Sequence, residues 1–298
     1  MPSSSGSCAP KTTTVDRGRE EGKPTGHVPP TSRQPAHTTK HLPFLHIPFR
    51  EHVFVLAQAD DGVSNGTTLW LGGQLLAAYI ASLPTPPKPT ARVIELGSGI
   101  GFTALGYHVL ATDGHPSVLA LLTQNIQRNA QNLPGSVQVR ELDWCVPPER
   151  WDWSDPSSIT SPCAYIGDPE LRVAPPVFDL IVTADTLYVP HLTPHLLRTL
   201  DHLQALTPVT GSSLSSPSSD SNHQPKVNTN RARQPTTLVA FERRDPALID
   251  AALALIPGSL TRIPHKKLSK ALQRAGWKWD ASDWDGVEIW KIKWGNSK

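Results

Sequence analysis

Residues 93–113 read V-I-E-L-G-S-G-I-G-F-T-A-L-G-Y-H-V-L-A-T-D, and this stretch decides the fold. It opens with the apolar run of a buried strand. Gly97, Gly99 and Gly101 then allow a tight turn and a close approach of ligand to backbone, because glycine reaches positive φ at little cost. A second apolar run ends in Asp113, whose carboxylate is placed to bind ribose hydroxyls. This order predicts the first half of a nucleotide-binding α/β unit.

The connection between the glycines and Asp113 is short. Such units have about 20 residues between the first glycine and the acid, whereas Gly97 and Asp113 are 16 positions apart. Only residues 102–105 separate Gly101 from the next glycine. Four helical residues rise about 6 Å, and a five-residue strand is about 17 Å long. We therefore expect either an extended return of the chain or only a stub of helix.

Upstream of this stretch the pattern changes twice. Apolar and polar residues alternate over 42–56, and Asn65-Gly66 is a turn signal, so we expect a small β extension. Trp70 follows, just before a helical pattern that starts at Gln74. Its side chain either packs in the core or forms an aromatic wall of a ligand pocket.

Downstream, three further strands each lead into polar residues. They are 136–142 before Asp143-Trp144, 177–182 before Ala184-Asp185-Thr186-Leu187-Tyr188, and 238–241 before Glu242-Arg243-Arg244. Polar groups at the carboxyl ends of parallel strands lie where open α/β sheets bind ligands. Asp143 and Trp144 either hold an adenine ring or form an ordinary loop. The charges after the last strand either face a substrate or form surface ion pairs.

These elements predict an α/β fold with a Rossmann-like, mostly parallel, seven-stranded sheet. A final strand pair, 277–279 and 287–294, fits an antiparallel C-terminal edge. The expected parts of the chain are a disordered tail (1–40) and one domain (41–298), which holds an irregular insertion (145–176) and a disordered insertion (207–236).

Composition narrows the class of function. The chain has 298 residues and a net charge of +2, which argues against nucleic-acid binding because that usually requires a basic face. Its three cysteines show no C-x-x-C spacing, which gives no support for a zinc site. No apolar run reaches the length of a membrane span, and the N-terminus lacks an apolar signal region. We expect a location in the cytoplasm or also in the nucleus.

The ordered set of motifs resembles the class I, seven-β-strand methyltransferases that depend on S-adenosylmethionine. More narrowly, it is similar to the protein-lysine methyltransferase branch, whose members modify elongation factors, chaperones and related proteins. The residues that carry the resemblance are Trp70, Glu95 to Gly101, Asp113, Leu142-Asp143-Trp144 and Ala184 to Tyr188. The glycine motif alone would indicate only a methyltransferase.

The resemblance implies a role for each matching residue and S-adenosylmethionine as the cofactor, with no metal. The implied cofactor-binding residues are Trp70, Glu95, Gly97, Ser98, Gly99, Gly101, Asp113, Asp143, Trp144 and Ala184. Glu95 would steady the loop or the cofactor's amino group, Asp113 would bind the ribose, and Asp143 with Trp144 would hold the adenine. Asp185 and Tyr188 would line the channel of the amine acceptor, where Asp185 would orient the amine.

The resemblance predicts a protein-lysine N-methyltransferase that acts on a cytosolic protein such as an elongation factor or a chaperone. An N-methyltransferase for small molecules on the same fold is an alternative, because the cofactor half is shared. A second alternative is a binding protein on the same fold that is catalytically impaired. The short segment after Gly101 motivates it, although that segment could also reflect residues lost in gene prediction. The glycine spacing G-S-G-I-G disfavours a dinucleotide oxidoreductase.

Overall fold

A computed structural model describes most of the chain between residues 34 and 294. The described residues are 34–59, 62, 64–83, 91–106, 108–160, 173–206 and 234–294. Most of the expected tail and of the expected insertion 207–236 lies outside them. Residues 34–40 were expected in the tail, but they include helix α1 (Ala36–Thr39), whose Ala36 is buried in the core.

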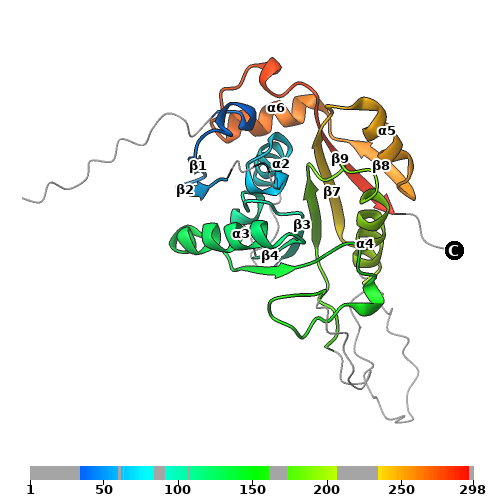
Figure 1. Cartoon of the computed structure of the whole chain (residues 1–298). Coiled ribbons are helices and arrows are strands. Elements are labelled where there is room, and N and C mark those ends of the chain that lie inside the picture. Colours follow the sequence, from blue (N-terminus) through cyan, green and yellow to red (C-terminus); the bar gives the residue numbers. More distant parts are fainter. Residues whose placement is uncertain are drawn as a thin grey trace, which may run out of the picture.

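One sheet of seven strands forms the centre of the described molecule (Figure 1). Its order is β5-β4-β3-β6-β7-β9-β8, with β9 antiparallel to both neighbours and the other pairs parallel. The strands are β3 (Arg92–Leu96), β4 (His108–Asp113), β5 (Val137–Glu141), β6 (Leu180–Ala184), β7 (Thr236–Glu242), β8 (Gly258–Arg262) and β9 (Val287–Trp294). The predicted α/β fold with an antiparallel C-terminal edge is confirmed.

Helices cover both faces of the sheet (Figure 1). On one face α2 (Leu71–Ala81), α3 (Pro116–Arg128) and α6 (His265–Arg274) share a core with the hairpin of β1 (Phe44–Phe49) and β2 (His52–Ala57). On the other face are α4 (Thr193–Ala205) and α5 (Pro246–Ala254). Short 3-10 turns are η2 (Asn65–Thr67), η3 (Thr103–Gly106), η4 (Ala130–Asn132), η5 (Pro148–Arg150) and η7 (Ala281–Asp283). Within the described residues, none of the helices is long and apolar enough to span a membrane.

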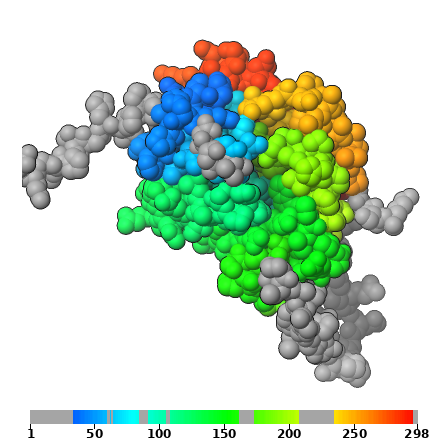
Figure 2. Space-filling model, in the orientation of Figure 1, coloured from blue at the N-terminus to red at the C-terminus, as the bar shows by residue number. Residues whose placement is uncertain are grey.

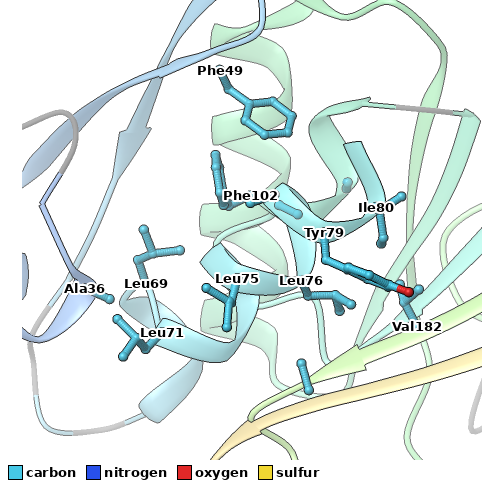
Figure 3. Packing of buried hydrophobic residues seen from close by; sticks show 14 of the residues in the cluster. Ala36, Phe49, Leu69, Leu71, Leu75, Leu76, Tyr79, Ile80, Phe102 and Val182 are labelled. Atoms are coloured by element: carbon cyan, nitrogen blue, oxygen red, sulfur yellow. The ribbon is translucent and has the colours of Figure 1, made fainter. Parts of the chain in front are cut away.

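The connection from β3 to β4 contains only the single turn η3, so the expectation of a stub is confirmed. Aromatic packing fills the space beside it. Phe102 is buried, with its ring centroid 5.5 Å from that of Phe49 and 6.1 Å from that of Trp277. Figure 3 shows Phe102 and Phe49 close to helix α2, and Figure 2 shows N-terminal and C-terminal parts of the chain on one surface. Hairpin, α2 and C-terminal segment together replace the missing length of helix.

Residues 277–279 do not form the strand expected of them. Gly276, at φ +73°, follows the C-terminal end of α6, and Trp277 then turns into the core with 2% exposure. Trp277 stacks on Trp279, with ring centroids 5.1 Å apart. The alternation W-K-W therefore reflects aromatic packing beside Phe102, and the edge strand is instead β8.

The expected insertion 145–176 is irregular but belongs to the core where it is described. Trp151 and Ile159 are buried on the α4 face of the sheet. The N–H of Ile159 donates to the carbonyl of Glu141, and the N–H of Glu141 donates to that of Ser157. These bonds cover part of the edge strand β5, which would otherwise present unpaired backbone groups.

Candidate active site

A cavity of about 730 Å³ opens at the carboxyl ends of the parallel strands. This is where an open α/β sheet is expected to bind its ligand, and the volume suits one of substantial size. The expected site residues that line it are Trp70, Gly97, Gly99, Asp113, Asp143, Trp144, Ala184, Asp185 and Tyr188. Glu95, Ser98 and Gly101 do not line the cavity.

The glycine loop presents backbone to the cavity. Gly97 has φ +67°, and a Cβ there would lie 2.8 Å from Cγ2 of Thr186 and 3.4 Å from the ring of Trp144. Gly99 has φ +52°, and a Cβ there would lie 3.1 Å from the carbonyl oxygen of Gly66. Only glycine combines this conformation with such close neighbours, so the loop passes beside Thr186, Trp144 and Gly66 and presents a bare backbone, the cradle, to the cavity.

Ser98 and Gly101 hold the loop from below. The hydroxyl of Ser98 donates to the carbonyl of Glu95 and accepts the N–H of Thr112, with distances of 3.3 and 3.0 Å. A Cβ on Gly101 would lie 2.5 Å from Cδ1 of Leu122 in α3. Gly101 therefore permits close packing of loop and helix, whereas Ser98 fastens the loop to β4.

Glu95 is a buried carboxyl beneath the same loop, with 2% exposure. Burial raises its pKa to about 8, although hydrogen bonds with Thr103 and Ser98 lower it and the charge of Asp113 raises it further. Its Oε2 atom has no hydrogen-bond partner among the described residues. This position fits the expected role of steadying the loop, since Glu95 is set back from the cavity wall.

Asp113 lies at the junction of the glycine loop and α3. Its carboxylate accepts backbone N–H groups of Gly99, Gly114 and His115 at 3.3, 2.9 and 3.2 Å. Burial raises its pKa, and these three bonds act in the opposite direction. The short η3 connection has therefore not separated the acid from the loop.

Asp143 and Trp144 form the wall of the cavity next to the glycine loop. The Asp143 carboxylate accepts the N–H of Cys145 at 2.8 Å, and Arg198 donates to the carbonyl of Trp144 at 2.7 Å. The indole N–H of Trp144 is buried without a partner in the described part of the chain. A half-buried ring above Gly97 offers a stacking surface for an adenine base.

Asp185 is held more firmly than the sequence suggested. Its backbone has φ +54°, and its two oxygens accept the N–H groups of Gly73 and Glu242, each at 3.1 Å. Because a Cβ on Gly72 would lie 2.5 Å from Oδ2, only glycine fits there. Burial chiefly raises the pKa of Asp185 to about 6. Asp185 lines the cavity and also fastens the start of α2 to the end of β7.

The remaining expected residues surround the mouth of the cavity. Tyr188 is 52% exposed there, and Ala184 lies at the end of β6. The indole N–H of Trp70 donates to the carbonyl of Asn65 at 2.6 Å. The ring of Trp70 has Nζ of Lys40 3.2 Å from its centroid and Cζ of Arg244 4.5 Å from it.

Some residues of the cavity were not expected there from the sequence. They include Ser64, Gly66 and His115 near the glycine loop, and Leu192, Leu248 and Ile249 from the starts of α4 and α5. The charged residues at the end of β7 were expected either to face a substrate or to form surface ion pairs, and they do not all behave alike. Glu242 and Arg244 line the cavity and pair with each other, whereas Arg243 pairs with Asp250 at 2.6 Å and Glu288 at 3.2 Å. In the sequence, the only signal that Glu242 and Arg244 lie at the site is their position at the end of a strand.

Known proteins share this sequence pattern. Residues 50–157 match the model of a family described as lysine methyltransferase. The protein N-lysine methyltransferase METTL21A of Danio rerio is 28% identical over 177 residues, which cover 57% of this chain and 70% of that protein. The calmodulin-lysine N-methyltransferase of Arabidopsis thaliana is 28% identical over 142 residues, which cover 45% of this chain and 39% of that protein.

Solved structures align at lower similarity. A predicted O-methyltransferase from Agrobacterium tumefaciens has a TM-score of 0.40 and 12% identity over 74% of this chain and 81% of its own. The 16S rRNA N2 G1207 methyltransferase of T. thermophilus, in complex with AdoMet and guanosine, has a TM-score of 0.41 and 10% identity over 86% of this chain and 46% of its own.

The family model and the two relatives indicate the class: this is a methyltransferase that depends on S-adenosylmethionine. The family model and the two relatives confirm the narrower resemblance to the lysine methyltransferases. The residues fit the cofactor, because the backbone of Gly97 and Gly99, the carboxylate of Asp113 and the ring of Trp144 line one cavity. The buried indole N–H of Trp144 also has no partner among the described residues. The described residues hold no cluster of metal-ligating side chains.

Proposed function

We propose that this protein transfers a methyl group to the ε-amine of a lysine in another protein, in the cytoplasm or the nucleus. One observation carries the proposal. A single cavity joins the glycine loop to a mouth that is lined by aromatic and acidic side chains, among them Trp70, Tyr188, Asp185 and Glu242. Aromatic faces and carboxylates are the groups that attract an alkylammonium ion.

In this proposal the residues of the site have separate roles in cofactor binding and in shaping the mouth of the cavity. S-adenosylmethionine supplies, when bound, an activated methyl that the lysine nitrogen accepts as the carbon–sulfur bond breaks, leaving S-adenosylhomocysteine. The cradle at Gly97 and the ring of Trp144 orient the donor, and such alignment is worth several kcal/mol of the barrier. Lysine must first lose a proton to solvent, since its ordinary pKa is about 10.4. Asp185 holds the start of α2, and with it Trp70, at a fixed distance from the end of β7.

The short β3–β4 connection gave a reason to expect an impaired enzyme. Two contacts argue against it. Asp113 still accepts the N–H of Gly99, and Ser98 still bonds to Thr112 across the two strands. The loop therefore keeps its place beside the acid although the intervening helix is a stub.

Tritium transfer from S-adenosylmethionine into extract of cells that lack this protein tests the proposal. We expect label in protein bands on a gel, and methyl-lysine after hydrolysis of those bands. Label in the low-molecular-weight fraction alone would instead identify the small-molecule N-methyltransferase. Binding of S-adenosylhomocysteine without label in either fraction would identify a binding protein. Candidate substrates to add in purified form are elongation factors and chaperones.

A further inference from the structure

The ring of Trp70 is a cation site at the mouth of the cavity, and two of the chain's own cations contact it. Nζ of Lys40 lies 3.2 Å from the ring centroid, and Arg244 is the one of the two that also lines the cavity. Cζ of Arg244 lies 4.5 Å from the ring centroid of Trp70, and its guanidinium pairs with the carboxylate of Glu242. All three residues line the cavity. An aromatic face and a carboxylate together are a general binding site for a positive charge.

Glu242 differs from the other carboxylates that line the cavity. The side chains of Asp113, Asp143, Asp185 and Asp245 each accept at least one backbone N–H. Among the described contacts, the side chain of Glu242 accepts only from Arg244. The charge of Glu242 is therefore paired with a side chain that can be exchanged, whereas the other four carboxylates are bound to backbone N–H groups.

The site is rigid, but its occupant is not. The backbone of Glu242 is fixed by pairing with β9 and by donating its N–H to Asp185, which also fastens the helix after Trp70. Arg244 follows the end of β7, and 49% of its side chain is exposed, against 24% for Glu242. Exposed ion pairs of this kind contribute little stability, so exchange of the partner is easy.

We propose that the ring of Trp70 and the carboxylate of Glu242 bind the ammonium of the acceptor lysine, and that Arg244 leaves this site when the substrate enters. The inference rests on the proposed function and names a binding residue for it. A lysine head is compact and carries three donors, so it can take both contacts that Arg244 now makes. The site receives the charged substrate; the proton leaves to solvent before the nitrogen reacts.

Two measurements on Glu242→Gln test this site. The first is the extract concentration that gives half of the maximal rate of tritium transfer into protein. It should rise at least about tenfold, because hydrogen bonds to charged groups are among the stronger ones, with little change in the maximal rate. The second is the affinity for S-adenosylhomocysteine by calorimetry, which should stay within about twofold if Glu242 serves the acceptor alone. Asp250→Asn is the matched control, since it breaks the exposed pair with Arg243 outside the cavity and should change neither value.

Arg244→Gln gives the opposite sign. Removal of the competing cation should lower the half-saturating extract concentration by about two- to fivefold, since a weak pair no longer has to break. Saturation of Glu242→Gln like wild type, or weaker saturation of Arg244→Gln, would overturn the inference and leave the proposed function standing. Failure of the wild type to label any protein would overturn both.

Discussion

The two sides of the cavity are built in different ways. The β3–β5 side comes mostly from residues 93–144, with Ser64 and Gly66 beside the glycine loop, and it offers the backbone of that loop together with the loops that follow β4 and β5. The β6–β7 side combines Trp70, the residues after β6 and the residues after β7, which are far apart in sequence, and offers mainly side chains. The first side requires particular backbone angles, and the second requires particular distances between elements.

The comparison shows where each half of the chemistry is encoded. Backbone angles depend on local residues, so glycines at fixed spacing are sufficient to mark the cradle. The distances between side chains depend on how the elements pack. On the β6–β7 side, the carboxylate of Asp185 links the start of α2, which follows Trp70, to the end of β7. Disruption of a glycine should therefore damage cofactor binding, whereas disruption of the link should damage the whole mouth.

Gly97→Ala should have the largest effect on the β3–β5 side. The substitution forces a residue with a Cβ to φ +67° and places that atom 2.8 Å from Thr186, whose hydroxyl is held at 2.8 Å from that of Thr183. Left-handed strain and overpacking together cost about 3 kcal/mol of folding stability. Because the atoms that must move belong to Thr186 and Trp144, which line the cavity, we also expect affinity for S-adenosylhomocysteine to fall at least about tenfold by calorimetry.

Gly276→Ala is the control for that experiment. Gly276 has φ +73° but meets no described atom within 4 Å of a Cβ. It should lose stability through strain alone, by about 1 kcal/mol, and keep the affinity for the cofactor product. Equal losses of affinity in the two variants would contradict the idea that binding depends on the close contacts of Gly97 with Thr186 and Trp144.

Asp185→Ala should break the β6–β7 side as a unit. Two backbone N–H groups lose a charged acceptor, and the free energy of unfolding should fall by about 3 kcal/mol in chemical denaturation. Methyl transfer should fall in parallel. Asp185→Asn keeps one acceptor oxygen and should lose about half as much. Loss of turnover in Asp185→Ala with unchanged stability would instead assign Asp185 to the amine itself.

The buried carboxyls make stability depend on pH. The folded-state pKa of Glu95 is about 8 and that of Asp185 about 6, both above the ordinary values. The native state therefore keeps protons that the unfolded chain has released, and stability should fall as pH rises from about 4.5 to about 8. Glu95→Gln should match wild type within about 1 kcal/mol at pH 5 and exceed it at pH 9 by about 4 kcal/mol, because the difference between pKa values of 4.5 and about 8 is worth about 1.4 kcal/mol per unit. Lower stability of Glu95→Gln at pH 9 would show that a partner stabilises the ionised form.

Trp144→Phe should have the smallest effect of the four. The smaller ring keeps an aromatic face above Gly97 but covers less of a base, so affinity for S-adenosylhomocysteine should fall roughly three- to tenfold. The maximal rate of transfer should change little, because the ring touches the donor far from the mouth. Unchanged affinity would place the adenine elsewhere in the cavity.

Particular residues show how far the sequence could be interpreted. Gly97, Asp113 and Trp144 were expected at the site because each follows a strand in a set order, and all three line the cavity. Trp277 was expected in a strand, yet it packs against Phe102, because alternation alone cannot distinguish a strand from two stacked rings. For Glu242 and Arg244 the sequence allowed two interpretations, a substrate contact or a surface ion pair. No local pattern distinguished these two residues from Arg243.

The sequence by itself determined the succession of strands along the chain, the glycine cradle and the class of enzyme that the chain resembles. These depend on local backbone preference and on the order of the motifs along the chain. Only the tertiary structure decided that a stub of helix is sufficient, that Asp185 fastens α2 to β7, and that Arg244 contacts both Trp70 and Glu242. Such contacts join residues far apart in the sequence, for example Asp185 with Gly73 and with Glu242, which are 112 and 57 positions away, and they follow from how helices and hairpin pack on the sheet.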